Sequence, residues 1–386
     1  MEEVLVREYD EERDFKMVVE LEKSCKTTAS PSNEGMSILS NMMGDDPLCR
    51  IRLYPLHVLL IAEILSEGEI VGIVRGCIKY VEIGVHERRR QVTMGSILGL
   101  RVSPTHRRKG VGVKLVQSIE EWLSKNGATY TFAATEENNA ASTNLFTLRR
   151  NYIKLSSLSI FVQRLNPPLD DLPEGVSFEQ LPTDQAISFY QTRLGAKDMY
   201  PTDIDMILKE KLSLGTWLCH FKEDNVKINH NDNKITGDSW MIFSIWNTCE
   251  AYKLQVKRTN HHSSPVYHAI EDDEENPKKM ACDSIEKPFG FLFLFGLLGE
   301  GDRLGELVKT LWSFALQIAE NVKDCKAIVT ELGFSDPIRE HVPEEVSTAC
   351  IDDSWYAKKI NNISSEDDDL VLKGELGNVF VDPRDF

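Results

Sequence analysis

Apolar and polar positions along the first 165 residues follow an order that predicts alternating strands and helices. The segment Val4–Arg7 has the pattern of a strand, and after a turn at Asp10 apolar side chains recur at helical spacing. From Leu56 onward, two β-rich runs flank the turn residues Ser66–Glu69, which is typical of an antiparallel hairpin. A buried strand is then expected over Ser96–Ser103.

An amphipathic helix is expected directly after this strand. It begins at Val111 and ends before Gly127, a residue that commonly stops helices. Its apolar stripe consists of Val111, Leu115, Ile119, Trp122 and Leu123. A strand over 128–135, a short helix over 140–150 and a closing strand near Ile153–Val162 complete the order. The pattern predicts an α/β fold built around a mixed sheet.

The same order returns in the second half of the chain. Residues 166–171, Asn-Pro-Pro-Leu-Asp-Asp, form a proline-rich acidic break that is typical of a linker. A strand and helix are expected over 176–194, a hairpin over 238–257, and a strand, loop, amphipathic helix and strand over 289–332. A duplicated fold is the simplest account of this repetition.

We therefore predict two domains, residues 1–165 and residues 166–386, of which the second is a degenerate copy of the first. Two low-complexity segments, 261–280 and 364–369, interrupt the second domain. Their polar and acidic composition predicts mobile loops.

Composition narrows the classes of protein to consider. The 386 residues are 41% apolar and 27% charged, as in a globular protein, and no run of about 18 uncharged apolar residues suggests a membrane span. The amino-terminal residues do not resemble a secretory signal, so we expect a nuclear or cytoplasmic protein that makes no use of a membrane. The eight cysteines include no Cys-x-x-Cys pair, which favours buried thiols and no metal site.

The net charge of −17 is unevenly distributed along the chain. Residues 1–165 hold 22 Lys and Arg against 21 Asp and Glu, whereas residues 166–386 hold 22 against 40. An acidic second half repels nucleic-acid phosphates and attracts basic polypeptides, so we expect no direct DNA binding and a basic acceptor or partner. The alternative, that the acidity only keeps the protein soluble, explains the charge equally well.

The strongest chemical signal lies between the buried strand and the helix at Val111. The run Arg107–Gly112, Arg-Arg-Lys-Gly-Val-Gly, joins three cations and two glycines to a helix N-terminus, which together form a cradle for a pyrophosphate. A P-loop would require Gly-Lys-Ser/Thr after a four-residue spacer, and a dinucleotide fingerprint would require a third glycine and a following acidic residue. This sequence fits neither pattern.

The arrangement Arg-x-x-Gly-x-Gly after a strand and a proline turn resembles the GCN5-related N-acetyltransferase (GNAT) superfamily. The resemblance continues downstream through Asn139, Ser142, Leu145, Phe146 and Tyr152. Over most of the chain the sequence is similar to the plant Hookless-type N-acetyltransferases, through runs such as VREYD, DPLCRIR, RGCIK, LGLRVSP and FVDPR. This likeness implies a nuclear role in transcription regulation, with histone acetylation as its chemistry.

The resemblance also implies a GNAT fold, in tandem, with acetyl-CoA as the cosubstrate and no metal. Acetyl-CoA would lie between two splayed strands that end at Val102 and near Thr135, with backbone groups of Leu100 and Val102 orienting the thioester. The implied cofactor-binding residues are Leu100, Arg101, Val102, Arg107, Arg108, Lys109, Gly110, Val111, Gly112, Asn139, Ser142 and Phe146.

Residues for proton transfer are less well marked. Phe146 stands where many members of the superfamily have tyrosine, so proton delivery would fall to water or to Tyr152. Glu136, after its strand, is the candidate base, although a surface carboxylate is the simpler interpretation of that residue. Two functions follow: an N-acetyltransferase acting on an amine of a protein or peptide, histone lysines included, or a non-catalytic acyl-CoA-binding regulator or scaffold.

Overall fold

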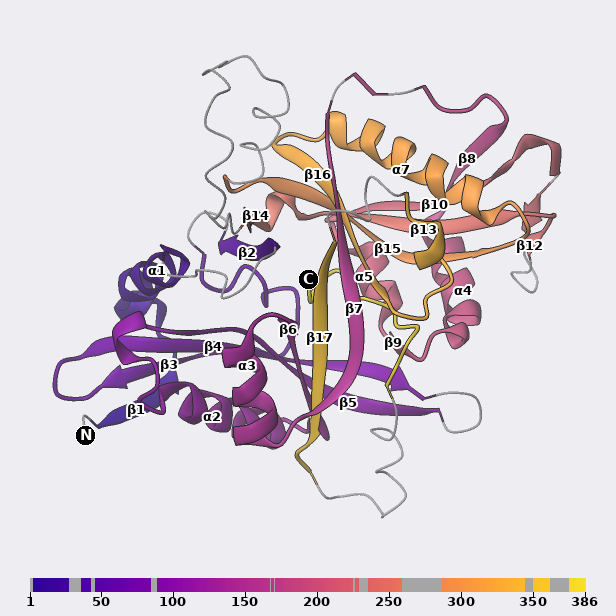
Figure 1. Cartoon of the computed structure of the whole chain (residues 1–386). Coiled ribbons are helices and arrows are strands. Elements are labelled where there is room, and N and C mark those ends of the chain that lie inside the picture. Colours follow the sequence, from indigo (N-terminus) through magenta and orange to yellow (C-terminus); the bar gives the residue numbers. More distant parts are fainter. Residues whose placement is uncertain are drawn as a thin grey trace, which may run out of the picture.

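The computed structural model describes residues 3–27, 36–42, 46–84, 89–166, 168–169, 171–224, 226–228, 235–258, 287–343, 350–361 and 375–386. Within these ranges a mixed sheet of 13 strands extends through the whole molecule. In Figure 1 the first half of the chain lies at the lower left and the second half at the upper right, and the long strands β7 and β17 run between them. The low-complexity segments 261–280 and 364–369 lie outside the described residues.

The first half follows the order expected from the sequence. Its elements are β1 (Val4–Glu8), α1 (Glu11–Thr27), β2 (Met36–Met42), β3 (His57–Ile64), β4 (Glu69–Ile83), β5 (Arg90–Val102), α2 (Val111–Lys125), β6 (Tyr130–Glu136), α3 (Ala140–Asn144) and β7 (Ile153–Arg164). β5 starts earlier than expected, at Arg90, because its first residues pair with the end of β4. A π-helical turn, Leu145–Arg149, follows α3.

The second half repeats much of this order. Its longer elements are β8 (Val176–Leu181), α4 (Thr183–Arg193), β9 (Met199–Pro201), α5 (Ile204–Lys209), β10 (Ser213–Phe221), β13 (Trp240–Asn247), β14 (Tyr252–Arg258), β15 (Gly290–Glu300), α7 (Leu304–Glu320), β16 (Cys325–Gly333) and β17 (Cys350–Lys359). The short strands β11 (Lys227–Ile228) and β12 (Ile235–Thr236) pair with each other.

The hairpin expected over 238–257 is wrong. β13 pairs with β10 and β15, whereas β14 pairs with β2 of the first half, in a separate two-stranded sheet. The 3₁₀ turn Thr248–Glu250 separates the two strands and directs the chain away from the large sheet. The strand β2 was not expected from the sequence, because its partner lies more than 200 residues further along the chain.

The two halves exchange their last strands. The sheet order runs β1-β3-β4-β5-β6-β17-β7-β16-β15-β13-β10-β8, so β17 pairs with β6 of the first half and β7 pairs with β16 of the second. β7 and β17 also pair with each other in antiparallel register. Each half contains one parallel pair, β5 with β6 and β15 with β16, as expected of a tandem fold with a mixed sheet.

Helices cover both faces of each half of the sheet (Figure 1). In the first half α1 packs on one face and α2 on the other. Successive strand residues point to opposite faces, so apolar residues of β3 and β4 form one cluster with α1 and another with α2. Three glycines allow α2 to approach the sheet closely. A Cβ atom at Gly72, Gly76 or Gly95 would lie 2.6–2.8 Å from side-chain carbons of α2.

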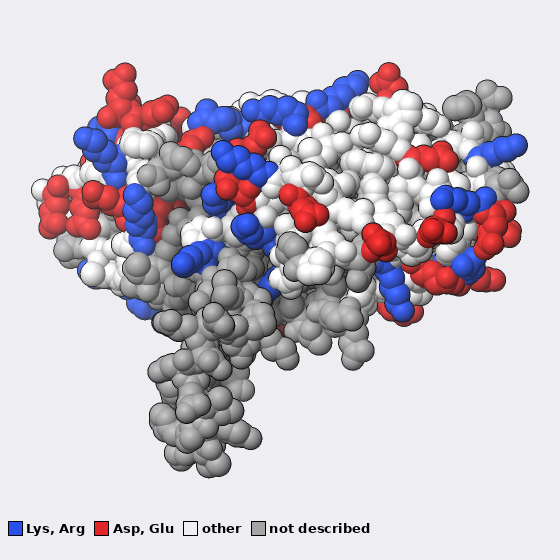
Figure 2. Space-filling model, turned by 90° about the horizontal axis from the view of Figure 1, so that it is seen from above, with Lys and Arg blue, Asp and Glu red and all other residues white. Residues whose placement is uncertain are grey.

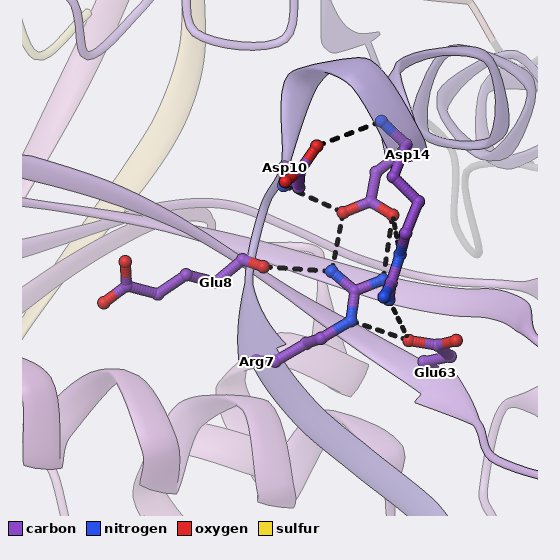
Figure 3. Close-up of polar contacts among 6 residues, drawn as sticks. Arg7, Glu8, Asp10, Asp14 and Glu63 are labelled. Carbon is purple, nitrogen blue, oxygen red and sulfur yellow. Dashed lines mark hydrogen bonds and ion pairs between the residues drawn. The ribbon is translucent and has the colours of Figure 1, made fainter.

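An ion-pair network fixes the start of α1 against the edge of the sheet (Figure 3). Asp14, which is fully buried, accepts hydrogen bonds from both terminal nitrogens of Arg7 at 2.6 and 2.8 Å and from the backbone N–H of Asp10 at 2.9 Å. Arg7 also donates to Glu63 on β3 at 2.7 Å. Burial by itself lowers the pKa of Arg7, but its bonds to these two carboxylates raise it above the usual value.

Replacing this central carboxylate should destabilise the protein. For Asp14→Asn we expect a loss of about 2–3 kcal/mol in the free energy of unfolding, because Arg7 loses one of its two carboxylate partners at a fully buried position. Urea unfolding followed by circular dichroism measures this difference. Glu12→Gln, the same chemical change at an exposed position of α1, is the control and should unfold like the unmodified protein. Equal stability of the two variants would contradict this account of α1.

Candidate active site

The candidate site forms where two neighbouring parallel strands part. β5 and β6 pair from Met94 with Tyr130 to Ile97 with Ala133, and beyond these residues they no longer pair, although β5 continues to Val102 and β6 to Glu136. The backbone of residues 98–102 therefore has a strand partner, β4, on one side only. This opening lies where the sequence predicted splayed strands.

A buried arginine, Arg75, stabilises an irregular bend of β5 at the start of the opening. Gly99 has φ of +57°, in the left-handed region, and a register shift in the pairing of β4 with β5 lies beside it. Arg75 donates to the carbonyl oxygen of Gly99 at 3.4 Å and of Pro47 at 2.7 Å, and its Nη2 bonds to Glu22 of α1 at 2.9 Å. A Cβ atom at residue 99 would lie 2.7 Å from the Arg75 guanidinium, so a side chain there would displace Arg75 from these bonds.

The loop after β5 presents an uncapped helix N-terminus. Gly110 is the N-cap of α2 with φ of +87°, and Arg108 also has positive φ, at +64°. Within α2, which the structure describes in full, no side chain caps the first turn and no acidic residue lies in it. The first N–H groups and the positive end of the helix dipole are thus left for a ligand anion.

A cleft of about 1420 Å³ connects this loop with the parted strands. Most of the residues expected to bind the cofactor line it. These are Leu100, Arg101, Val102, Arg107, Arg108, Gly110, Gly112, Asn139 and Ser142, joined by the candidate base Glu136. A Cβ atom at Gly112 would make only ordinary contacts, at 3.5 Å or more, so the protein itself has room for a side chain there. The surface that glycine leaves open faces the cleft.

Four of the expected residues are not among those lining the cleft. Val111, the first residue of α2, is buried against the sheet, and Lys109 is exposed on the loop. Phe146 packs edge-on against Tyr152 with ring centroids 5.1 Å apart. The hydroxyl of Tyr152 accepts a hydrogen bond from Thr131 at 2.8 Å in the core. Burial and the nearby Glu120 raise the pKa of Tyr152 well above its usual value. Its role as a proton donor stays a prediction.

Backbone carbonyls of β5 accept side-chain hydrogen bonds on the cleft side. Arg101 donates to the carbonyl oxygen of Leu100 at 3.1 Å, and Arg107 and the Cys25 thiol donate to that of Val102 at 3.4 and 3.5 Å. Burial raises the pKa of Cys25, so this thiol is protonated at neutral pH and is not a thiolate nucleophile.

The other end of the cleft contains residues that the sequence reasoning missed. It is lined by Phe132, Ile160, Glu331, Asp353, Trp355 and Asp385. Glu331 lies in the run Ala-Ile-Val-Thr-Glu-Leu of β16, where it is the only charged residue, and a carboxylate within a buried strand was the one sequence signal available. Apart from Phe132 of β6, these residues come from the second half and the exchanged strands, whose proximity to the cleft only the sheet order shows.

The matching position in the second half is closed. β15 has its own left-handed glycine, Gly296 with φ of +64°, but Tyr190 of α4 fills the space and donates to the carbonyl oxygen of Gly296 at 2.9 Å. Only residues 301–303 join β15 to α7, compared with residues 103–110 between β5 and α2. A Cβ atom at Gly301 would lie 2.1 Å from the carbonyl oxygen of Asp238, so this short loop is packed closely against the backbone of residue 238.

Comparisons with known proteins agree with this geometry. Residues 18–152 match the model of the Acetyltransferase (GNAT) family. Over 99% of its length the chain is 33% identical to the probable N-acetyltransferase HLS1 of Arabidopsis thaliana, and the match covers 100% of that protein. The chain belongs to the GNAT family. It is also 32% identical to the probable N-acetyltransferase HLS1-like of the same plant, with 99% of each chain covered.

Among solved structures, this GNAT protein is similar in fold to N-myristoyltransferase of Saccharomyces cerevisiae with bound myristoyl-CoA. The TM-score is 0.53 at 12% identity, and the match covers 92% of this chain and 83% of that one. That likeness is one of fold, whereas the family match and the relatives make the chain a GNAT N-acetyltransferase. The uncapped N-terminus of α2 lies beside Arg107 and Arg108 at the cleft, an arrangement that suits an anion such as a phosphate. In the described part of the chain, no helix is long and apolar enough to cross a membrane.

Filling the open surface at Gly112 should block the cosubstrate. For Gly112→Val we expect the Kd of acetyl-CoA, measured by calorimetry, to rise roughly tenfold or more, because two methyl groups occupy the approach to the helix N-terminus. Gly112→Ala should have a smaller effect. Gln117→Val places the same β-branched side chain at an exposed position of the same helix, away from the cleft, and should bind normally. Gly110 is less suitable for this test, since its positive φ adds backbone strain to any substitution.

The closed second half should leave one cosubstrate site per chain. Calorimetric titration of acetyl-CoA into the full-length protein should therefore give a stoichiometry of one. The carboxylates of Glu300 and Asp302 lie where the basic loop stands in the first half, so a second pyrophosphate would also meet like charge. A measured value of two would overturn this view of the second half.

Proposed function

We propose that this protein transfers the acetyl group of acetyl-CoA to an amine of a protein or peptide. Lysines of basic tails of the histone type are the first acceptors to test, and an acceptor of that kind would place the enzyme in the nucleus in a regulatory role. The observation that carries the proposal is a single cleft that joins an anion cradle, at Gly110 and Gly112, to buried carboxylates of the second half.

In this proposal the residues of the first half bind and orient the cosubstrate. Arg107, Arg108 and the first N–H groups of α2 neutralise the pyrophosphate, and the backbone of residues 98–102 aligns the thioester between the parted strands. Bound acetyl-CoA supplies an activated acyl group. The acceptor amine attacks it directly, in keeping with the protonated state of the Cys25 thiol.

Surface charge gives only weak guidance about the acceptor. Residues 166–386 are strongly acidic, which favours a basic acceptor. However, on the face of the molecule seen in Figure 2, Lys and Arg side chains lie among Asp and Glu side chains and form no continuous area of one sign. We therefore assign selectivity to the interior of the cleft and not to the outer surface on that face.

Acetyl transfer to amines tests the proposed function directly. Purified full-length protein is incubated with labelled acetyl-CoA and a set of acceptors: a histone-type tail, an acidic peptide with one lysine, and a polyamine. We expect transfer to the basic tail at the highest kcat/KM, with free CoA released in equal amount. Gly112→Val should lose this activity in proportion to its loss of acetyl-CoA binding. Tight binding of acetyl-CoA without transfer to any amine would instead favour the non-catalytic regulator.

A further inference from the structure

Two carboxylates in the cleft differ from every other buried carboxylate that the structure describes. Each of the others is paired with a cation: Asp14 with Arg7, Glu22 with Arg75, Glu120 with Arg150 and Lys358, Asp336 with Lys197, and Asp382 with Arg384. Glu331 and Asp353 are equally buried, with 6% and 7% of their surface exposed, but among the described residues neither forms an ion pair. The Oε1 atom of Glu331 has no hydrogen-bond partner at all.

The strand exchange brings these two carboxylates together. Glu331 on β16 lies opposite Ile160 of β7, and Asp353 on β17 lies opposite Leu158 of the same strand, so the two flank β7 diagonally. Both line the cleft, together with the apolar side chains of Ile160 and Trp355. Asp353 also lies opposite Glu136 at the end of β6, directly beside the parted strands.

Glu331 and Asp353 contact each other and Trp355, but no cation of the described residues offsets their burial. Two buried carboxylates without a cation are costly, so their place in a cleft points to a cationic ligand. A ligand that relieves this cost must carry a positive charge and N–H donors, and the apolar walls of the cleft suit a methylene arm. A primary ammonium on an alkyl chain has these properties. A guanidinium has them too, but it does not lose its proton and cannot act as the attacking nucleophile.

We propose that Glu331 and Asp353 form the acceptor subsite, which binds the ammonium group of a primary amine and takes its proton before attack. This inference rests on the proposed function. The freed nitrogen lone pair forms the C–N bond with the thioester carbonyl carbon, and the C–S bond breaks with its electron pair leaving on sulfur. The second N–H proton passes to that sulfur, which gives CoA thiol and the amide, and the carboxylate pair releases its proton to solvent.

The charges around the pair suit this role. Burial, and then the charge of Glu136, raise the pKa of Asp353 to about 7, while burial and the charge of Asp353 raise that of Glu331 well above its usual value. Asp385 also faces the pair, but its carboxylate is bound by Lys79 and by the Tyr54 hydroxyl. Arg50 stacks over Tyr252 and donates to the backbone carbonyl of Asp385. Both carboxyl groups therefore hold a proton more readily than an exposed carboxylate does, as a group that accepts a proton from an ammonium must.

Carboxylate-to-amide variants test the subsite. Asp353→Asn should lower kcat for acetyl transfer roughly 100-fold or more, as expected for loss of a general base, and leave the Kd of acetyl-CoA within a few-fold. Glu331→Gln should raise KM for the amine more than it lowers kcat. Asp352→Asn is the matched control, since this neighbouring carboxylate is exposed and accepts a hydrogen bond from Ser159.

A pH profile separates proton transfer from a structural role. In the unmodified protein kcat/KM should rise as pH increases through about 7, because the pair must be ionised to accept a proton. This rise should be absent in Asp353→Asn and present in Asp352→Asn. An unchanged profile and near-normal activity in Asp353→Asn would overturn the proposal. Thermal unfolding shows that the variant folds, and we expect no loss of stability because no ion pair is removed.

Three acceptors distinguish the sources of the amine: a lysine peptide with a blocked N-terminus, a lysine-free peptide with a free N-terminus, and spermidine. If the unmodified protein binds acetyl-CoA but acetylates none of them, the proposed function fails, and the subsite is then judged by binding alone. Calorimetry with n-butylammonium, in the presence of a CoA thioether, should detect binding that Asp353→Asn abolishes and Asp352→Asn retains. Binding that is the same in both variants, or no binding, would overturn the subsite.

Discussion

The parting of β5 and β6 after Ile97 and Ala133 is the constraint on which the site depends. Pairing satisfies the backbone groups of parallel strands, so an opening persists only where other interactions hold it. Here the bulge at Gly99 turns β5 aside, and the Arg75–Glu22 pair anchors the bulge to α1. The ion pairs of Asp14 in turn hold α1 on the sheet, so interactions far from the cleft maintain its shape.

The exchange of β7 and β17 gives the second half a part in this site. If each half closed its own sheet, β6 would pair with β7, and Asp353 and Glu331 would lie in a separate domain. Because β17 pairs with β6 instead, the opening of the first half is continued by side chains of the second. The two halves thus differ in their parts. In the second half Tyr190 fills the space at Gly296 that corresponds to Gly99, so only the first half keeps the anion cradle, whereas the second half supplies buried carboxylates.

The sequence was informative where function depends on local chain geometry. The apolar stripe of α2, the glycines before it and the strand that ends at Val102 are all encoded within about 30 residues, and periodicity and spacing identify them. The exchanged strands and the pairing of β2 with β14 could not be found this way. They depend on contacts between residues more than 160 positions apart, which leave no periodic trace in one sequence.

Glu331 illustrates the same limit at the level of one residue. In sequence it is a lone carboxylate in an apolar strand, a pattern that fits a buried ion pair as well as a functional group. The structure distinguishes the two possibilities. Asp336, five residues further on, is also buried and binds Lys197 at 2.6 Å. By contrast, Oε1 of Glu331 has no hydrogen-bond partner. A cationic partner offsets the cost of burying a carboxylate, and a buried carboxylate without one lowers stability unless a ligand supplies the charge. The lack of a cationic partner, and not burial alone, therefore distinguishes Glu331 and Asp353 at the end of the cleft away from α2.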